Sequence, residues 1–229
     1  MKPTLLATLM LAIPLAHAAD LKLDTDEQKA AYFAGMQIGA GLQRDVGDLD
    51  IEIIKKGLTD GFKKNKPAIS EDAANQAMIN YQQKRQSEMI ARNGAAAKKF
   101  LLENAKKPGV VSLPSGLQYQ VLKAGNGSVS PQRSSSVKVN YHGTLLDGTV
   151  FDSSAQRGAP ATFGLGQVIP GWVEGLQLMK AGDKWKLFVP PELAYGNRAL
   201  GPIPPASLLV FEVELLEVMP AAADKAAGK

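Results

Sequence analysis

Hydrophobic residues recur at a helical period in the first half of the chain and at a strand period in the second. In the first half, Thr25 and Gln28 form a capping box, and Tyr32, Met36 and Leu42 follow at helical spacing. This pattern predicts a helix that begins near Thr25. Gly35 and Gly39 lie on the same face, where they would let a second helix approach closely.

Two more helices are predicted before the pattern changes. A helix over residues 50–63 carries one apolar stripe, made of Ile51, Ile54, Leu58 and Phe62. A third begins after Pro67 with an acidic first turn and meets no proline before Pro108, which gives about 35 residues and a length of ~50 Å. Its second half, residues 85–99, is mostly polar and predicts an exposed stalk. Because the two shorter helices can form little core alone, this region favours dimerisation.

After Pro108 the apolar residues alternate with polar ones, as in strands with one buried face. Alternation predicts strands around residues 117–121, 137–145, 150–151, 184–189 and 208–218. Asp147 and Gly148 form a hairpin signal, and Trp172, Leu176 and Met179 predict one short helix. The fold class is therefore α+β: an all-helical domain with a long stalk helix, then an antiparallel sheet wrapped on one short helix.

The first residues have the form of an export signal. Lys2 gives a positive start, residues 5–15 are apolar, and Ala16-His17-Ala18 is a small-x-small cleavage site. An apolar run of about eleven residues is too short to cross a bilayer, so we expect an exported protein that does not span the membrane. The predicted divisions are a signal peptide (1–18), a helical dimerisation domain (19–108), a sheet domain (109–219) and a disordered tail (220–229).

Composition excludes several classes of function. The chain has no cysteine and two histidines, of which only His142 follows the predicted cleavage site. No G-x-S-x-G elbow accompanies His142, and by strand alternation it points away from the face that carries Tyr141, so we assign it no role. We expect no metal, cofactor or covalent intermediate. The net charge of +4 is spread along the chain, which argues against nucleic acid as a partner.

Several ordered motifs in the second half closely resemble those of the FKBP-type peptidyl-prolyl cis-trans isomerases. These are Val139-Asn140-Tyr141-His142-Gly143-Thr144-Leu145, Asp147 to Ser154, Val168-Ile169-Pro170-Gly171-Trp172, Ala194-Tyr195-Gly196 and Ile203 to Leu215. The first half is similar to the helical dimerisation module of exported two-domain members of the macrophage infectivity potentiator (Mip-like) class. Gly57 to Phe62 and the long third helix carry that part of the resemblance.

The resemblance implies an FKBP-like fold and a set of site residues. Four residues are expected to be catalytic: Tyr141, Phe151, Asp152 and Tyr195. Six are expected to bind substrate: Phe163, Val168, Ile169, Trp172, Ile203 and Phe211. Arg157 stands where an arginine supports the aspartate. Two features depart from the family: Ala161 replaces a common bulky aromatic, and the loop 197–202 is shortened.

The roles within this pocket follow as hypotheses. Trp172 forms the floor under the prolyl ring, while the backbone N–H of Ile169 and the hydroxyl of Tyr195 donate to substrate carbonyls. Two roles stay open for Asp152. Its carboxylate either stabilises the twisted amide electrostatically, or accepts hydrogen bonds from its neighbours and keeps the pocket in shape.

The function that follows is a prolyl isomerase that assists the folding of exported proteins by non-covalent catalysis. The alternative is a periplasmic or surface chaperone whose pocket binds clients without significant catalysis. The expected partners are proline-containing unfolded polypeptides, macrolide inhibitors of the FKBP pocket and a second copy of the chain. We expect the periplasm as the location, with the outer membrane surface and secretion left open.

Overall fold

The computed structural model describes residues 21–47 and 49–219. The predicted signal peptide and C-terminal tail lie outside these residues. The chain divides into two compact units, one reaching to Ser70 and the other beginning at Glu71. None of the helices within the described ranges is long and apolar enough to cross a bilayer.

The first unit contains α1 (Asp26–Val46) and α2 (Ile51–Lys63). The predicted capping box is confirmed: the Gln28 backbone N–H donates to Thr25 Oγ1 at 3.3 Å, and Gln28 Oε1 accepts from the Thr25 N–H at 3.1 Å. Asp50 caps α2 by accepting from the N–H groups of Glu52 and Ile53. Both helices expose many large apolar side chains: Tyr32, Phe33, Met36, Ile38, Ile51, Ile53, Leu58 and Phe62.

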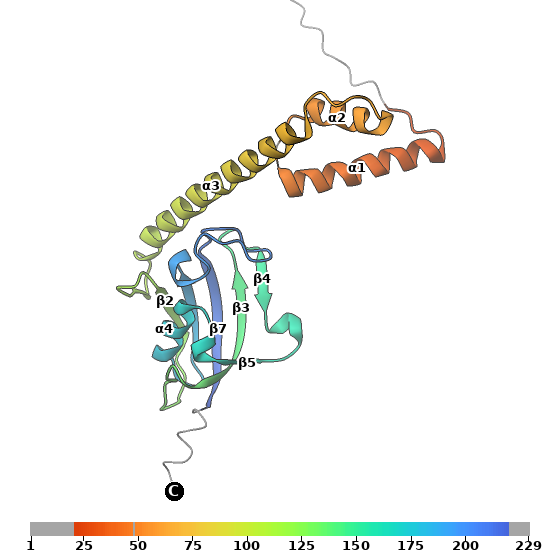
Figure 1. Ribbon diagram of the computed structural model, residues 1–229. Helices are drawn as coiled ribbons and strands as arrows, with labels where there is room; N and C mark the ends of the chain where they lie inside the picture. Colours follow the sequence, from red (N-terminus) through yellow and green to blue (C-terminus); the bar gives the residue numbers. More distant parts are fainter. Residues whose placement is uncertain (1–20, 48, 220–229) are drawn as a thin grey trace, which may run out of the picture. The chain divides into compact units, whose positions relative to one another are not determined.

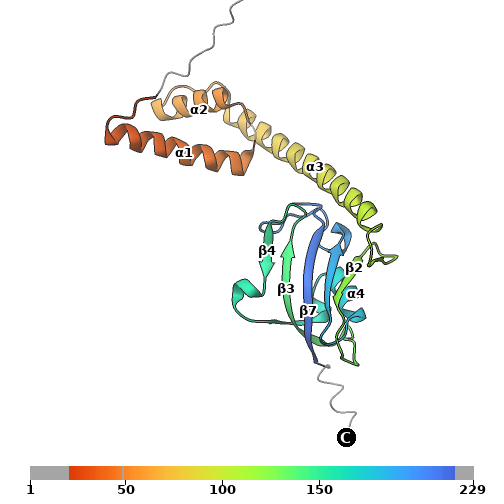
Figure 2. The ribbon, with the colours of Figure 1, turned by 180° about the vertical axis from the view of Figure 1, so that it is seen from behind.

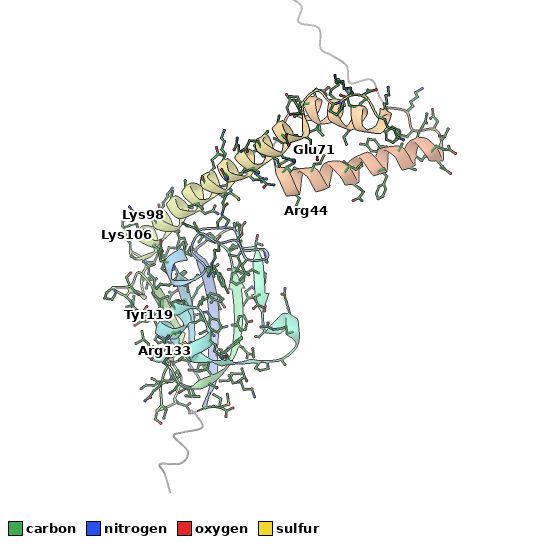
Figure 3. All side chains as sticks on the ribbon, in the orientation of Figure 1. Arg44, Glu71, Lys98, Lys106, Tyr119 and Arg133 are labelled. Carbon is green, nitrogen blue, oxygen red and sulfur yellow. The ribbon has the colours of Figure 1, made fainter. Side chains whose placement is uncertain are left out.

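The second unit begins with α3 (Glu71–Asn104), whose 34 residues confirm the predicted long helix (Figure 1). The expectation of an exposed stalk through residues 85–99 is wrong for the C-terminal end. Ala97 is buried with Phe188, Leu208 and Val210, and the ring of Phe100 lies 5.6 Å from that of Phe188. A small side chain at position 97 lets the helix approach the sheet, so α3 ends as part of the sheet domain. Lys98 lies on this part of α3 (Figure 3).

The rest of the unit is a seven-stranded antiparallel sheet with the order β1-β2-β6-β7-β3-β4, in which β5 also pairs with β3 (Figure 2). The strands are β1 (Val110–Ser112), β2 (Gln118–Lys123), β3 (Ser136–Thr144), β4 (Val150–Ser153), β5 (Ala161–Gly164), β6 (Lys184–Val189) and β7 (Leu209–Met219). The predicted strands and the α+β class are confirmed. The strands β1 and β5, three and four residues long, were not predicted.

One helix, α4 (Pro170–Leu178), packs against the sheet and closes the core. Leu176 and Met179 are fully buried with Leu187 and Val213 of the sheet. Tyr119 lies on β2 (Figure 3). Its ring stacks on that of Trp185 of β6 with ring centroids 4.4 Å apart. The packing of Leu176 and Met179 fixes α4 on one face of the sheet, so its N-terminal end also has a fixed place.

The hairpin between β3 and β4 is confirmed at the predicted turn. The Leu145 N–H donates to the carbonyl of Thr149 at 2.9 Å, and Gly148 adopts a positive φ of 87°. The Thr149 N–H donates to Asp147 Oδ1 at 2.9 Å, and this hydrogen bond lowers the pKa of Asp147. The turn returns the chain directly into β4, where two predicted site residues lie.

Candidate active site

One cavity of about 510 Å³ gathers ten of the eleven residues predicted for the site. It is lined from β3, β4, β5, the start of α4, the loop before β7, and β7 itself. The lining residues are Tyr141, Phe151, Asp152, Phe163, Gln167, Val168, Ile169, Trp172, Tyr195, Leu200, Gly201, Pro202, Ile203 and Phe211. The eleventh residue, Arg157, binds two of them from outside the lining.

Trp172, in the first turn of α4, is the buried centre of an aromatic cluster. Its ring meets Tyr141, Phe163 and Phe211 edge to face, with centroids 5.2, 5.7 and 5.2 Å away. Edge-to-face pairs orient aromatic rings beyond what burial alone would do. The cluster therefore gives the cavity an apolar surface whose rings hold one another in place.

Phe151 and Phe211 complete this surface because Gly143 leaves room for them. A Cβ atom at Gly143 would lie 2.7 Å from two carbons of the Phe151 ring and 3.0 Å from the Phe211 ring. The two phenyl rings meet edge to face at 5.4 Å. Steric crowding by these two rings therefore explains why a glycine stands at position 143 of the Tyr141-His142-Gly143 motif.

A polar group closes one side of the cavity. The Tyr141 hydroxyl donates to Asp152 Oδ2 at 2.6 Å and accepts a hydrogen bond from Arg157. Arg157 Nη1 lies 3.3 Å from Asp152 Oδ1, and its guanidinium stands over the Tyr141 ring at 5.3 Å. The side chains of Asp152 and Arg157 are 42% and 50% exposed, so this ion pair is in contact with solvent.

Both predicted hydrogen-bond donors at the cavity lack an acceptor among the described residues, and so does the buried Nε1 of Trp172. The backbone N–H of Ile169 precedes α4, and Pro170 at the first helical position fixes the entry of the chain. The Tyr195 hydroxyl is the second, on a loop held by the hydrogen bond from the Gly196 N–H to the Pro191 carbonyl at 2.8 Å. Both residues line the cavity, so both donors are available to a bound chain.

Four lining residues were not predicted: Gln167, Leu200, Gly201 and Pro202. The last three lie on the loop of residues 197–202, where Leu200 and Ile203 exchange backbone hydrogen bonds of 2.9 and 3.0 Å. The apolar character of Leu200 and Pro202 was the signal available in the sequence. A loop has no periodicity, however, so the sequence does not show which of its side chains face the cavity. Ala161 lies outside the lining and packs against the core.

His142, to which the sequence assigned no role, does not line the cavity. His142 is exposed and lies in a separate polar depression with Glu212 and Glu214. Across the described part of the chain, no group of three or more His, Cys, Asp or Glu is arranged to hold a metal ion.

An antiparallel sheet on one short helix, with a tryptophan-floored aromatic cavity at the helix start, defines the class of FKBP-type prolyl isomerases. The family model described as FKBP-type peptidyl-prolyl cis-trans isomerase matches residues 127–216. The model described as the domain amino terminal to that isomerase matches residues 27–121.

Relatives with both parts support the same assignment. The chain is 41% identical to the outer membrane protein MIP of Legionella longbeachae, covering 97% of this chain and 99% of the relative. It is 45% identical to the FKBP-type 22 kDa peptidyl-prolyl cis-trans isomerase of Escherichia coli K12, covering 86% and 97%. The crystal structure of FkpA from Escherichia coli matches with a TM-score of 0.67 and 40% identity, covering 86% and 99%.

The chain therefore belongs to the FKBP-type peptidyl-prolyl cis-trans isomerase family, in its Mip-like class with an N-terminal helical domain. It is an enzyme that isomerises peptidyl-prolyl bonds, and its FKBP domain binds proline-containing substrates. The alternative of a chaperone without catalysis is not favoured by these relatives.

Proposed function

We propose that the aromatic cavity is the place where the prolyl bond is isomerised and that the residues around it divide binding from catalysis. This proposal rests on one observation: the same cavity is lined by the aromatic cluster around Trp172 and by two unpartnered donors, the Ile169 N–H and the Tyr195 hydroxyl. A prolyl ring is apolar and its flanking amides are polar, so one cavity can bind both parts.

The chemistry needs no nucleophile. The trans form of an X–Pro bond is favoured by only ~0.5–1 kcal/mol, whereas rotation crosses a barrier of ~18–20 kcal/mol that comes from lost amide resonance. The planar amide is more charge-separated than the twisted one. An apolar cavity therefore disfavours the planar form relative to the twisted form, and binding complementary to the twisted form lowers the barrier further.

The two donors fit the carbonyl groups on either side of the rotating bond. A hydrogen bond from the Ile169 N–H anchors one carbonyl at the start of α4, and the Tyr195 hydroxyl binds another across the cavity. The prolyl ring lies on Trp172 between them. Anchoring the chain on both sides lets one side turn while the other is held, which is the positioning that catalysis by orientation requires.

For Asp152 we favour the positioning role over the electrostatic one. Both of its oxygens are already engaged, one by the Tyr141 hydroxyl and one by Arg157. Its side chain is 42% exposed, whereas a strong field at the substrate carbon needs a desolvated carboxylate. Asp152 therefore acts by holding the Tyr141 ring in the wall of the cavity.

The direct test is isomerisation of a short X–Pro peptide by the mature protein, with and without a macrolide inhibitor of FKBP pockets. We expect catalysis that the inhibitor abolishes, and loss of inhibitor binding in Trp172→Ala. Catalysis that persists at saturating inhibitor would place the activity outside this cavity. A folded protein without catalysis would leave the cavity as a binding site alone.

We also propose that α1 and α2 form a homodimer interface. Phe62 is 92% exposed, and Ile53, Ile51 and Phe33 are each at least 60% exposed, which is unusual for large apolar residues on a soluble domain. A second copy of the same helices is the occupant that supplies matching apolar surface. Sedimentation should give a dimer for the mature chain and a monomer for Phe33→Glu with Phe62→Glu, while Lys63→Glu, on the side of α2 opposite Ile54, stays dimeric.

We infer that the protein is exported and assists the folding of exported chains, with the periplasm as its location. The signal-like sequence of residues 1–18 supports this, and one relative carries the name outer membrane protein MIP. Cell fractionation with protease treatment of intact cells separates periplasmic from surface-exposed protein.

Two linked cavities in a dimer would hold one unfolded client at two points and so raise the effective concentration at each.

A further inference from the structure

Asn93 of α3 reaches a turn at the edge of the catalytic cavity. Its side-chain Nδ2 donates to the backbone carbonyl of Pro205 at 2.9 Å, although the two residues are 112 positions apart. Asn93 is half-buried and Pro205 is buried. Most of the preceding helix is exposed, so this hydrogen bond is a specific contact between α3 and the loop that leads into β7.

The turn that accepts this hydrogen bond has an unusual backbone. Ala206 adopts a φ of 54°, in the left-handed region that residues with a Cβ rarely occupy. Such a conformation persists only when its surroundings hold it in place. The surroundings here are the Ser207 hydroxyl, which donates to the Pro204 carbonyl at 2.8 Å, and the contact from Asn93.

The same turn holds two parts of the cavity. Ile203, a buried wall residue, comes directly before Pro204. On the other side, the Ala206 N–H donates to the Gly196 carbonyl at 2.8 Å, and Gly196 follows Tyr195, whose hydroxyl is one of the two proposed substrate donors. A displacement of the turn therefore moves an apolar wall and a hydrogen-bond donor together.

We propose that Asn93 is a positioning residue for catalysis, which acts from α3 by fixing the turn at residues 204–207. This inference rests on the proposed role of the cavity. A buried carbonyl without a partner is costly, so loss of the Asn93 donor favours rearrangement of the turn. A rearranged wall still admits a prolyl ring but holds the twisted form less well. Because the loss then falls on the transition state, kcat falls more than KM rises.

The test compares three changes at Asn93 in the full-length protein, assayed on a short X–Pro peptide. Asn93→Asp keeps the size and removes the donor, so kcat/KM should fall by about fivefold to tenfold, mostly through kcat. Asn93→Gln keeps the donor, and a cavity of about 180 Å³ beside Asn93 gives the longer side chain room. It should recover at least half of the activity. Asn93→Ala replaces Asn93→Asp if the carboxylate prevents folding.

Two controls separate positioning from a general loosening of α3. Arg92→Ala changes an exposed neighbour on the same helix. Asn104→Asp breaks another polar contact of α3 with the sheet domain, the 3.0 Å hydrogen bond from Asn104 Nδ2 to Gln118 Oε1, and Gln118 does not line the cavity. Both should keep kcat/KM within about twofold, although Asn104→Asp should unfold at a lower temperature.

The outcomes distinguish the two proposals. An inactive wild-type protein would overturn the proposed function of the cavity itself. An active wild type with a fully active Asn93→Asp would overturn the role of Asn93 alone. Equal losses in Asn93→Gln and Asn93→Asp would show that the hydrogen bond is not what matters, and an equal loss in Asn104→Asp would reduce Asn93 to general support of α3.

Discussion

Asp152 contacts both the Tyr141 hydroxyl and Arg157. A substitution that removes the negative charge of Asp152 but keeps an oxygen acceptor therefore tests which of its two roles is correct. In Asp152→Asn, an amide oxygen can still accept from Tyr141. If Asp152 positions Tyr141, we expect kcat/KM within about fivefold of wild type, since one net hydrogen bond contributes ~1 kcal/mol. Asp152→Ala should lose about tenfold or more, because the Tyr141 hydroxyl loses its acceptor. Peptide isomerisation measures both, and equal losses would instead assign the effect to the charge.

Asp183 is a second carboxylate with a defined role, and it lies outside the lining of the cavity. It is 7% exposed and accepts from the Gly125 N–H at 2.6 Å and the Lys180 N–H at 2.7 Å. In Asp183→Ala both donors lose a charged acceptor, so the free energy of unfolding should fall by about 2–4 kcal/mol.

Urea unfolding measures the change at Asp183, with Asp183→Asn as the matched variant that keeps one acceptor and loses about half as much. Because Asp183 does not line the cavity, kcat/KM of the folded protein should stay within about twofold. A loss of activity in folded Asp183→Asn would contradict this separation of stability from catalysis.

At the scale of elements, the position of α4 on β6 depends on a glycine. A Cβ atom at Gly171 would lie 2.4 Å from Val189 Cγ1. Gly171→Ala should therefore push α4 away from the sheet, lower the free energy of unfolding by about 1–3 kcal/mol, and reduce kcat/KM because Trp172 moves with the helix. Denaturant unfolding and the peptide assay measure the two effects.

Gly94 in α3 offers the matched control, since a Cβ atom there meets nothing within 4 Å. Gly94→Ala should raise the free energy of unfolding by up to about 1 kcal/mol through helix propensity alone, with unchanged activity. If both alanine variants raised the free energy of unfolding, backbone propensity rather than space would control these sites.

The elements differ in how far the sequence predicts them, for physical reasons. The helices α1 to α3 and the strands β2, β3, β6 and β7 have enough residues for a period to show, and Thr25 and Asp50 mark two helix starts. β1 and β5 are too short for that. The packing of α3 on the sheet depends on Ala97. Alanine is as common on exposed helices as on buried ones, so the sequence alone does not show this contact. At the site, Leu200 to Pro202 have no periodicity, so their part in the cavity appears only in three dimensions.

At the scale of the whole molecule, the end of α3 belongs to the unit that contains the cavity. The domain boundary predicted at residues 108 and 109 would remove Ala97 and Phe100 from Phe188, Leu208 and Val210. A chain that begins at Gly109 should therefore lose about 2–4 kcal/mol of unfolding free energy from apolar surface newly exposed to water. A chain that begins at Ser87 keeps these contacts and should keep its stability. Urea unfolding of the two shortened chains measures the difference, and equal stabilities would contradict the role of the α3 end.

The chain beginning at Ser87 also separates catalysis from client handling. It lacks α1 and α2, so we expect a monomer in sedimentation, with kcat/KM on a short X–Pro peptide within about twofold of the full-length protein. Refolding of a long proline-limited client should be slower with this monomer at equal cavity concentration, because two linked cavities raise the local concentration for a chain already bound at one. A persistent dimer would move the interface to α3 or the sheet domain. Equal refolding rates would mean that the two cavities of the dimer work independently.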